Sequence, residues 1–221
     1  MSKPYNPLEK ANLAASIVRA ILDSPVHQLS NTAHLTGAGV YVIYYVGKLK
    51  CYSPLAKANA DGQFNQPIYI GKAIPKGGRK GGLTEDAAAK GTALRDRLNQ
   101  HLASVAEASN LHASDFFFKS LVVDDIWIPL GENILIEQYK PVWNRVVDGF
   151  GNKDPGQRRA AQHGSPWDVL HPGRKFAVKL GSNPRLAKEI IDDLKAYFET
   201  GSMPRRRKAA SESEAAEDGA E

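Results

Sequence analysis

Three stretches of the chain repeat apolar residues at the spacing of an amphipathic helix. The first, residues 7–23, places on one helical face the side chains of Leu8, Leu13, Ile17, Ile21 and Leu22. The second follows Thr92, a residue type that caps helix N-termini, and the third occupies residues 183–200. A fourth helix is predicted to begin near Glu132 and to end at Pro141, because proline cannot continue the hydrogen-bond ladder of a helix.

Shorter apolar runs between these helices predict strands at 40–46, 67–71 and 116–125. A further short strand is expected near 176–180. The connection between the first two strands is too long for a tight turn, so we expect a short excursion there. Residues 72–91 are rich in glycine and basic residues, which is typical of a mobile loop.

The composition excludes several classes of protein. The single cysteine, Cys51, cannot build a disulfide framework or a thiolate metal site within one chain, and we expect it to be a small strand residue. No run approaches the ~18 apolar residues of a membrane helix. The polar N-terminal sequence differs from a secretory signal. These features predict a protein of a reducing compartment, the cytoplasm, with no membrane partner.

The charge is unevenly distributed. Residues 209–221 contain five acidic and no basic side chains, and the rest of the chain holds 29 basic and 19 acidic residues, a net charge of +10. Such an excess favours a polyanionic partner, because lysine and arginine release the counterions of a nucleic acid. A well-solvated surface is the alternative. The end of the chain, residues 201–221, is expected to be a disordered charged tail.

Two tyrosines lie beside glycines at strand ends. Tyr41 ends the stretch Gly39-Val40-Tyr41, and Tyr69 begins the stretch Tyr69-Ile70-Gly71. The two strands are either an ordinary hairpin or a device that holds two phenols over one reactive atom. Tyr44 and Tyr45, next on the first strand, are expected to be core or surface strand residues.

Further polar side chains follow in order. Arg97 and His101 are four residues apart and share a helical face, which is offset from the leucines and expected to point away from the packed side. Glu132 is expected in the first turn of its helix, where its charge suits the positive helix end. Asn144 follows twelve residues later. Each has a plainer interpretation when taken alone: a surface charge, a satisfied histidine or a capping residue.

Taken together and in this order, these residues resemble the signature of the GIY-YIG nuclease superfamily. The stretches "GVY" and "YIG" are similar to its two named motifs, "ALRDRLNQHL" to its arginine helix, and "ENILIEQYKPVWN" to the glutamate helix of its repair members. That alignment selects Glu132 over Glu137, because Glu132 keeps the twelve-residue step to Asn144. The long loop after Tyr69 is a departure from most repair members.

The chain through about residue 200 more closely resembles the GIY-YIG Type II restriction endonucleases that cut CCGCGG. "YNPLEKANL", "PKGGRKGG", "DGFGNKDPG" and the histidine at 101 carry this resemblance. It implies an α+β fold with a small three-stranded, mostly antiparallel sheet flanked by helices.

The resemblance also divides the chain. We expect a helical extension at 1–36, a catalytic core at 37–148 with its basic loop at 72–91, and a DNA-binding or packing extension at 149–200.

The resemblance implies roles for the site residues. Tyr41 would take a proton from water and pass one toward His101, although an isolated phenol, with a pKa of about 10, is a poor base. Tyr69 would orient the water and the phosphate, and Arg97 would bind the phosphate in the transition state. Which tyrosine is the base stays open.

The glutamate helix would supply the metal site. Glu132 would hold one divalent cation, Mg²⁺ with Mn²⁺ as a substitute, at the phosphate and the leaving 3′ oxygen. Asn144 would tie the helix to the site.

The remaining basic segments are candidates for the DNA interface. The candidates on the glycine-rich loop are Lys72, Lys76, Arg79 and Lys80. Arg158 and Arg159 would reach guanine edges or contact phosphates only.

The expected function is metal-dependent double-strand cleavage of DNA at a short GC-rich palindrome. A palindrome has a twofold axis, so we expect a homodimer on double-stranded DNA. The first helix, with Leu13, Ile17 and Ile21, and the loops after 144 are expected to supply the dimer contact or arms that encircle the DNA. A methyltransferase acting on the same sequence is the expected functional partner. A repair or homing-type nicking nuclease and a non-catalytic DNA-binding protein are the alternatives.

Overall fold

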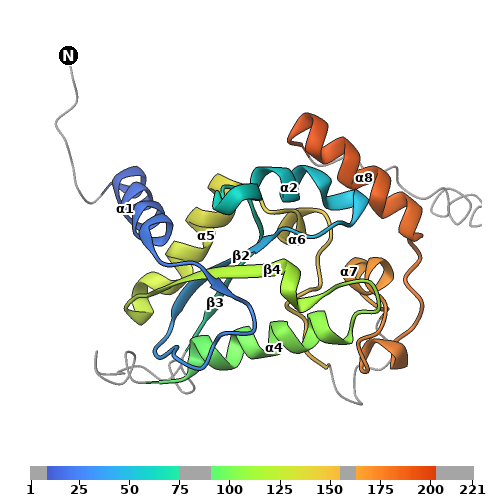
Figure 1. The fold of residues 1–221 in the computed structure, drawn as a ribbon, viewed down its shortest axis with the longest axis horizontal. Coiled ribbons are helices and arrows are strands. Elements are labelled where there is room, and N and C mark those ends of the chain that lie inside the picture. The colour runs from blue at the N-terminus through green and yellow to red at the C-terminus, as the bar shows by residue number, and fades with distance from the viewer. Residues whose placement is uncertain (1–8, 75–90, 155–162, 203–221) are drawn as a thin grey trace, which may run out of the picture.

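A four-stranded sheet forms the centre of the protein, whose computed structural model describes residues 9–74, 91–154 and 163–202 (Figure 1). Its strands are β1 (His27–Gln28), β2 (Gly39–Tyr45), β3 (Pro67–Ala73) and β4 (Phe116–Val122). They lie in the order β1-β4-β2-β3, and each neighbouring pair is antiparallel. The class predicted from the sequence, α+β, is confirmed.

The prediction of three strands is wrong, because β1 pairs with β4 at one edge of the sheet. A strand of two polar residues has no alternating pattern, so nothing in its sequence distinguishes it from a link. The strand expected near 176–180 is a 3₁₀ helix, η7 (Ala177–Lys179), in which Val178 is 79% exposed. Cys51 is likewise in a 3₁₀ helix, η1 (Lys50–Tyr52), and not in a strand.

Side chains of β2 alternate between two cores. Tyr41, Ile43 and Tyr45 enter the larger core, whereas Val40, Val42 and Tyr44 enter the smaller one. All seven residues of β2 are buried, so Tyr44 and Tyr45 are core residues. Burial on both faces explains why this strand has no polar alternation.

Helices cover both faces of the sheet. They are α1 (Lys10–Asp23), α2 (Ser53–Ala58), α4 (Ala93–Glu107), α5 (Ile128–Tyr139), α6 (Val142–Arg145), α7 (Pro166–Leu170) and α8 (Ala187–Thr200). Figure 1 shows α4 on one side of the sheet and α1 with α5 on the other. The four helices predicted from periodicity are present. The expected excursion between β2 and β3 consists of η1, α2 and a second 3₁₀ turn, η2 (Ala60–Gly62).

Helix α5 begins four residues earlier than predicted. Pro129 stands in its first turn, where a missing N–H costs nothing, and the helix continues through Gly131. A side chain at Gly131 would have its Cβ 3.3 Å from Val40, so this glycine lets α5 lie close to the sheet. Glu132 is therefore in the second turn and not at the positive end of the helix, which corrects the expected dipole contact.

The N-terminal and C-terminal helices pack onto the same body. Ile21 of α1 is 1% exposed against the smaller core, so it cannot supply the expected dimer contact. Residues of α7 and α8 complete the larger core, together with Phe150. No helix in the described ranges has the length and apolarity needed to cross a membrane.

Candidate active site

Strands β2 and β3 bring the two signature tyrosines together. Tyr41 pairs with Gly71 and Tyr69 pairs with Ile43, so both rings lie on the α4 side, with centroids 6.3 Å apart. This register runs unbroken from Gly39 to Ile43 and shifts only after Ile43. A Cβ at Gly71 would lie 2.3 Å from the Tyr41 hydroxyl. The second signature thus needs glycine because the phenol of the first signature occupies that space.

His101 on α4 forms the closest contact with this pair. Its Nε2 is 2.7 Å from Tyr41 Oη, and the residue is 1% exposed. The expectation that His101 points away from the packed side is wrong. It continues the buried row of Leu94, Leu98 and Val105 at helical spacing, a signal that the sequence does carry.

Burial decides which partner holds the proton. It raises the pKa of Tyr41 well above 10, with Tyr69 adding to the effect and Arg97 opposing it. Burial, followed by the charges of Arg97 and Arg174, lowers the pKa of His101 well below 6.5. Tyr41 is therefore a neutral phenol and His101 a neutral imidazole, and in the His101 tautomer with its proton on Nδ1 the phenol donates this hydrogen bond to Nε2.

Arg97 lies half-buried beside Tyr41, Tyr69 and His101. Its guanidinium donates to the Gly151 carbonyl at 2.9 Å and to Gln100 Oε1 at 3.0 Å. Burial raises the pKa of Tyr69, and the Arg97 charge works against that rise. Arg97 is thus the cation that favours any negative charge formed near the two phenols.

Glu132 faces Lys72, the first residue after the signature glycine. Glu132 Oε2 and Lys72 Nζ are 2.6 Å apart, and their side chains are 16% and 34% exposed. Glu132 raises the pKa values of Tyr41 and Tyr69, so its charge reaches the phenols. Lys72, predicted as a DNA contact, here pairs with the candidate metal ligand.

Glu132 offers a single carboxylate to a metal ion, which suits a cation that keeps most of its water ligands. Within the described ranges, no group of three histidine, cysteine, aspartate or glutamate side chains could hold a metal ion. Mg²⁺ keeps several waters and takes one or two carboxylates together with substrate phosphates. The partly exposed carboxylate of Glu132 fits such a cation and does not form an all-protein cage.

Asn144 on α6 holds the edge strand. Its Oδ1 accepts from the N–H of Ile70 at 2.8 Å, and its Nδ2 donates to the carbonyl of Ile70 at 2.9 Å. Ile70 is the middle residue of the second signature. Asn144 therefore fastens the backbone between Tyr69 and Gly71 to α6, directly after the glutamate helix.

The segment after α6 supplies contacts that sequence reasoning did not assign. Phe150 stacks on His101 with centroids 4.4 Å apart at 19°, and meets Tyr69 edge-on at 5.0 Å. Gly151 accepts the hydrogen bond of Arg97. Its stretch, "DGFGNKDPG", carried a family likeness only, because loop packing leaves no periodic signal.

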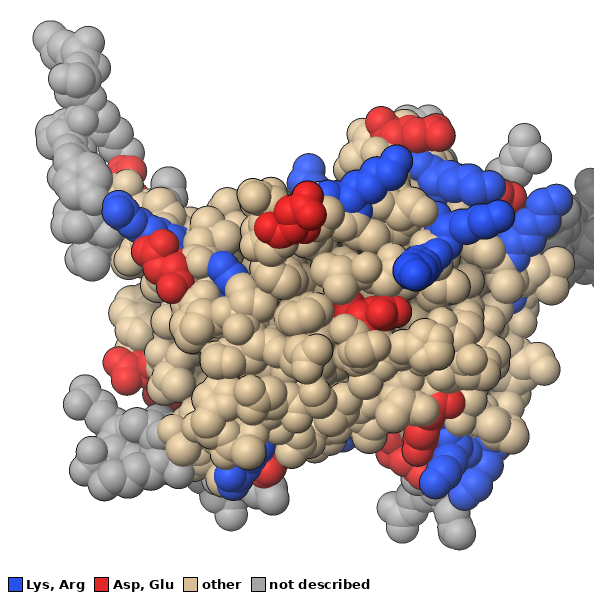
Figure 2. All heavy atoms as spheres, in the orientation of Figure 1, with Lys and Arg blue, Asp and Glu red and all other residues tan. Residues whose placement is uncertain are grey.

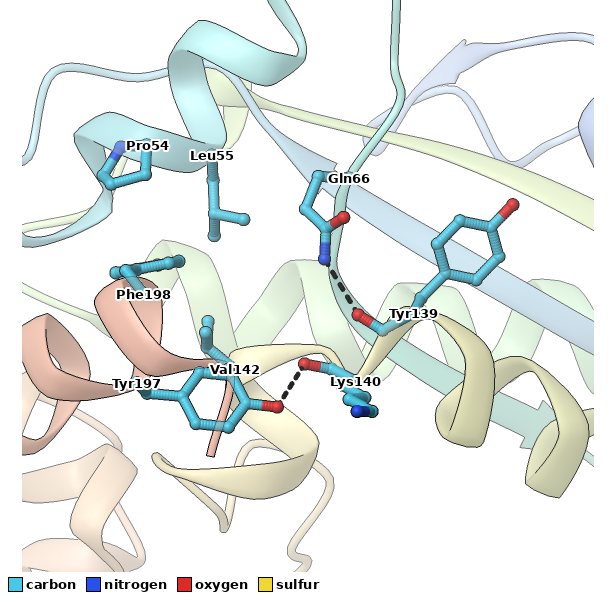
Figure 3. Close-up of a pocket in the computed structure, with 9 residues that line it drawn as sticks. Pro54, Leu55, Gln66, Tyr139, Lys140, Val142, Tyr197 and Phe198 are labelled. Atoms are coloured by element: carbon cyan, nitrogen blue, oxygen red, sulfur yellow. Dashed lines mark hydrogen bonds between the residues drawn. The ribbon is translucent and has the colours of Figure 1, made fainter. Parts of the chain in front are cut away.

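Two cavities have different linings. One of about 200 Å³ opens beside Arg97, His101 and Phe150 and is bordered by Asn152 and Lys153. The other, about 260 Å³, lies between α2, the end of α5 and α8 (Figure 3).

The second cavity is a site of helix anchoring. In Figure 3, Gln66 Nε2 donates to the Tyr139 carbonyl and Tyr197 Oη to the Lys140 carbonyl, each at 2.9 Å. These bonds satisfy the C-terminal carbonyls of α5. The first cavity adjoins His101, which is hydrogen-bonded to Tyr41, and is therefore the one placed for proton transfer.

The remaining predicted DNA contacts cannot be placed. Lys76, Arg79 and Lys80 lie outside the described residues, as do Arg158 and Arg159.

The comparison with family models agrees with this geometry. The model described as the Eco29kI GIY-YIG domain matches residues 33–198, about three quarters of the chain. The match includes both tyrosine signatures, α4, α5 and the segment with Phe150. A search for similar curated proteins gives no match. The chain belongs to the Eco29kI GIY-YIG family of restriction endonucleases.

Proposed function

We propose that the protein is a Type II restriction endonuclease that hydrolyses phosphodiesters on both strands of a short GC-rich palindrome. The resemblance favours CCGCGG as that palindrome. The observation that carries the proposal is the hydrogen bond from buried Tyr41 to neutral His101, beside Arg97 and Glu132. Hydrolysis needs a proton acceptor, a cation at the phosphate and help for the leaving oxygen, and this group offers all three.

The proton acceptor is the Tyr41–His101 pair. A phenol with a raised pKa does not ionise by itself near neutral pH. When Tyr41 Oη accepts a proton from the attacking water, its own proton moves to His101 Nε2, 2.7 Å away. The lowered pKa of His101 keeps that nitrogen free to accept before the reaction.

Arg97 and Tyr69 orient the phosphate. Arg97 holds the Gly151 carbonyl, and a DNA phosphate offers its guanidinium a charged acceptor in place of a neutral one. Tyr69 meets the stacked rings of His101 and Phe150 edge-on, and its hydroxyl lies next to Gly151, as does the Arg97 guanidinium. Both residues bind and orient, and neither needs to ionise.

Glu132 is the residue that would hold Mg²⁺, or Mn²⁺ in its place. The cation would stabilise negative charge on the phosphate and on the leaving 3′ oxygen. Lys72, paired with Glu132, would turn from the carboxylate to a DNA phosphate when the cation and DNA arrive. Lys72 would then make the DNA contact that the sequence predicts.

The basic surface supports a DNA partner. In Figure 2, lysine and arginine side chains gather over the part of the molecule where α2 and α8 lie in Figure 1, with acidic side chains scattered among and below them. A C2 homodimer would place one site on each strand of a palindrome. A cytoplasmic methyltransferase of the same specificity would protect the host DNA.

Digestion of plasmid DNA tests the proposal. Purified protein with Mg²⁺ should convert a plasmid with known CCGCGG sites into discrete linear fragments, and EDTA should stop the reaction. Nicked circles alone would indicate a nicking nuclease instead, and intact plasmid under all conditions would indicate a non-catalytic protein. Sedimentation with a cognate duplex should give two chains per duplex.

A further inference from the structure

A second arginine, Arg174, lies buried behind the catalytic group. It is 1% exposed and follows α7 in the chain. Its Nε donates to Asp168 Oδ1 at 2.7 Å, and Nη2 reaches Ser165 Oγ at 3.4 Å. The guanidinium lies over the rings of Trp167 and Phe176, 4.4 Å and 4.7 Å from their centroids.

These contacts fix the guanidinium in one orientation. Asp168 compensates its charge and is itself held by Ser165, whose hydroxyl donates to Asp168 Oδ2 at 2.6 Å. The ring contacts restrict tilting of the planar group, and the donors of an arginine diverge at fixed angles. A lysine in this position would keep the charge but lose the fixed set of donors.

The remaining donors of Arg174 hold the segment that covers the catalytic residues. Nη2 donates to the Gly149 carbonyl at 3.0 Å, and Nη1 to the Phe150 carbonyl at 3.2 Å. The Phe150 ring then stacks on His101, and the next carbonyl, that of Gly151, accepts from Arg97. Two carbonyls fixed by Arg174 thus set the positions of the groups that contact His101 and Arg97.

We propose that Arg174 is a positioning residue for DNA cleavage: it holds residues 149–151 so that Phe150 fixes the His101 ring and Gly151 fixes the Arg97 guanidinium. The proposal rests on the proposed nuclease function. It predicts that a change at Arg174 affects the chemical step more than DNA binding. A misplacement of about 1 Å can lower a catalytic rate about 100-fold.

The charge of Arg174 adds a second effect. With Arg97, it helps to keep the pKa of His101 low, after the larger effect of burial. Among the described residues, the titratable and charged groups around His101 are Tyr41 from β2, Tyr69 from β3, Arg97 from α4, Arg174 after α7, and Glu107 and Lys153 at the shared cavity. Loss of the Arg174 charge removes one of the effects that keep His101 neutral.

Three variants separate positioning from general stability. Arg174→Lys keeps the charge and loses the planar contacts, whereas Arg174→Met loses both. Arg185→Lys is the matched control, because Arg185 pairs with Asp193 as Arg174 pairs with Asp168, but in a partly exposed pair at α8. Each variant is compared with wild type in single-turnover cleavage, DNA affinity in Ca²⁺, melting temperature and the pH dependence of the rate.

We expect Arg174→Lys to lower the single-turnover rate about 10- to 100-fold while DNA affinity stays near wild type. Arg174→Met should in addition move the acidic limb of the pH–rate profile, and the His101 titration seen by NMR, to higher pH. Arg185→Lys should cleave like wild type. If both Arg174 variants fail to fold, Phe150→Leu decides, because it removes the ring stack without touching Arg174.

Arg174→Lys with an unchanged rate would overturn the proposal, as would a loss explained wholly by the unfolded fraction. A Phe150→Leu protein with wild-type rate would do the same. A wild-type protein that cleaves no DNA would overturn the proposed function and this inference together. Failure of the Arg174 variants alone leaves the nuclease function standing.

Discussion

The protein contains two buried tyrosine–histidine pairs that differ in their surroundings. Tyr41 bonds His101 at 2.7 Å in the candidate active site, and Tyr52 bonds His171 at 2.8 Å in the larger core. Burial lowers the pKa of both histidines, that of His171 to about 3. A perturbed pKa therefore does not by itself distinguish the functional pair from the structural one.

The Tyr52–His171 pair has a further hydrogen-bond partner on each side. Trp143 Nε1 donates to Tyr52 Oη at 2.8 Å, Tyr52 donates to His171, and His171 Nδ1 meets Asn110 Oδ1 at 2.9 Å. This chain of bonds assigns the proton of His171 to Nδ1. Each polar atom along it is satisfied, so the network stabilises the contact of α7 with the rest of the core.

The Tyr41–His101 pair is open, because it adjoins a cavity and charged groups. Its histidine borders a cavity, and its tyrosine has a second phenol, a guanidinium and a carboxylate within electrostatic reach. A tyrosine–histidine hydrogen bond can therefore stabilise a core or take part in proton transfer. Complete satisfaction makes it structural, whereas neighbouring charge and access make it suited to proton transfer.

The largest loss of cleavage is expected on replacing Glu132, whose charge acts on the Tyr41–His101 pair. Glu132→Gln should abolish metal-dependent cleavage, by roughly 1,000-fold or more, because it removes the proposed metal ligand and a preorganised charge. DNA binding should persist, since the change removes a negative charge near phosphate. Glu137→Gln, on an exposed part of the same helix, is the control and should cleave normally. Near wild-type cleavage by Glu132→Gln would move the metal site elsewhere.

Replacing the two histidines should separate the two pairs. His101→Ala should lower the single-turnover rate roughly 100- to 10,000-fold, the usual range for loss of a proton acceptor. His171→Ala should instead lower the free energy of unfolding, by about 2–5 kcal/mol, because it leaves a cavity and unpaired polar groups. Kinetics and urea denaturation of both variants give the measurement. Equal losses of activity at equal folded fraction would remove the distinction.

Acid should weaken the fold through both pairs. Above pH 6.5 the histidines are neutral in the folded and unfolded chains, and their low folded pKa values have no effect on stability. Below pH 6.5 the unfolded chain binds protons that the folded chain does not, so stability falls by up to about 1.4 kcal/mol per pH unit for each histidine. For His171 this continues until about pH 3.

Urea denaturation between pH 6.5 and 5 measures this slope before most carboxylates titrate. His171→Gln should reduce the slope, and His101→Gln should reduce it as well. A free energy of unfolding that stays constant over this range would contradict the burial of both rings as neutral groups.

The smallest effect is expected at the second phenol. Tyr69→Phe keeps the ring contacts with His101 and Phe150 and loses only the hydroxyl beside Arg97 and Tyr41. The cleavage rate should fall about 3- to 10-fold, the equivalent of one neutral hydrogen bond. A loss as large as that of Tyr41→Phe would assign the base to Tyr69, the alternative that the sequence leaves open.

Apolar patterns predicted the long helices, which bury one regular face, and the three longer strands, of which β2 is an apolar run buried on both faces. Glu132 and His101 show where that reasoning failed. Pro129 and Gly131 resemble helix breakers, so the sequence placed Glu132 too near a helix end, whereas tertiary packing carries the helix through both. His101 belongs to the buried row of α4, whereas its face was expected to be offset from the leucines and to point outward.

The order of the motifs named the candidate side chains, and the fold brings Tyr41, Tyr69 and His101 together beside Arg97. The register of β2 and β3 brings Tyr41 and Tyr69 to one face. Phe150 and Arg174 were beyond prediction because their contacts depend on loops separated by long stretches of chain. The pairing of Lys72 with Glu132 was missed for the same reason, since spacing gives no register between a strand and a helix.

A comparison of Tyr41→Phe with Tyr52→Phe shows which tyrosine–histidine pair transfers the proton. Each variant removes one hydroxyl from one tyrosine–histidine pair and leaves the ring in place. At equal folded fraction, single-turnover cleavage with Mg²⁺ should fall roughly 100-fold or more for Tyr41→Phe. Its loss of stability should be only about 1 kcal/mol, because it removes the one hydrogen bond to His101. Tyr52→Phe should cleave at near wild-type rate and lose about 1–3 kcal/mol of stability, because Trp143 and His171 each lose a partner. Wild-type cleavage by Tyr41→Phe would contradict the assignment of proton transfer to the open pair.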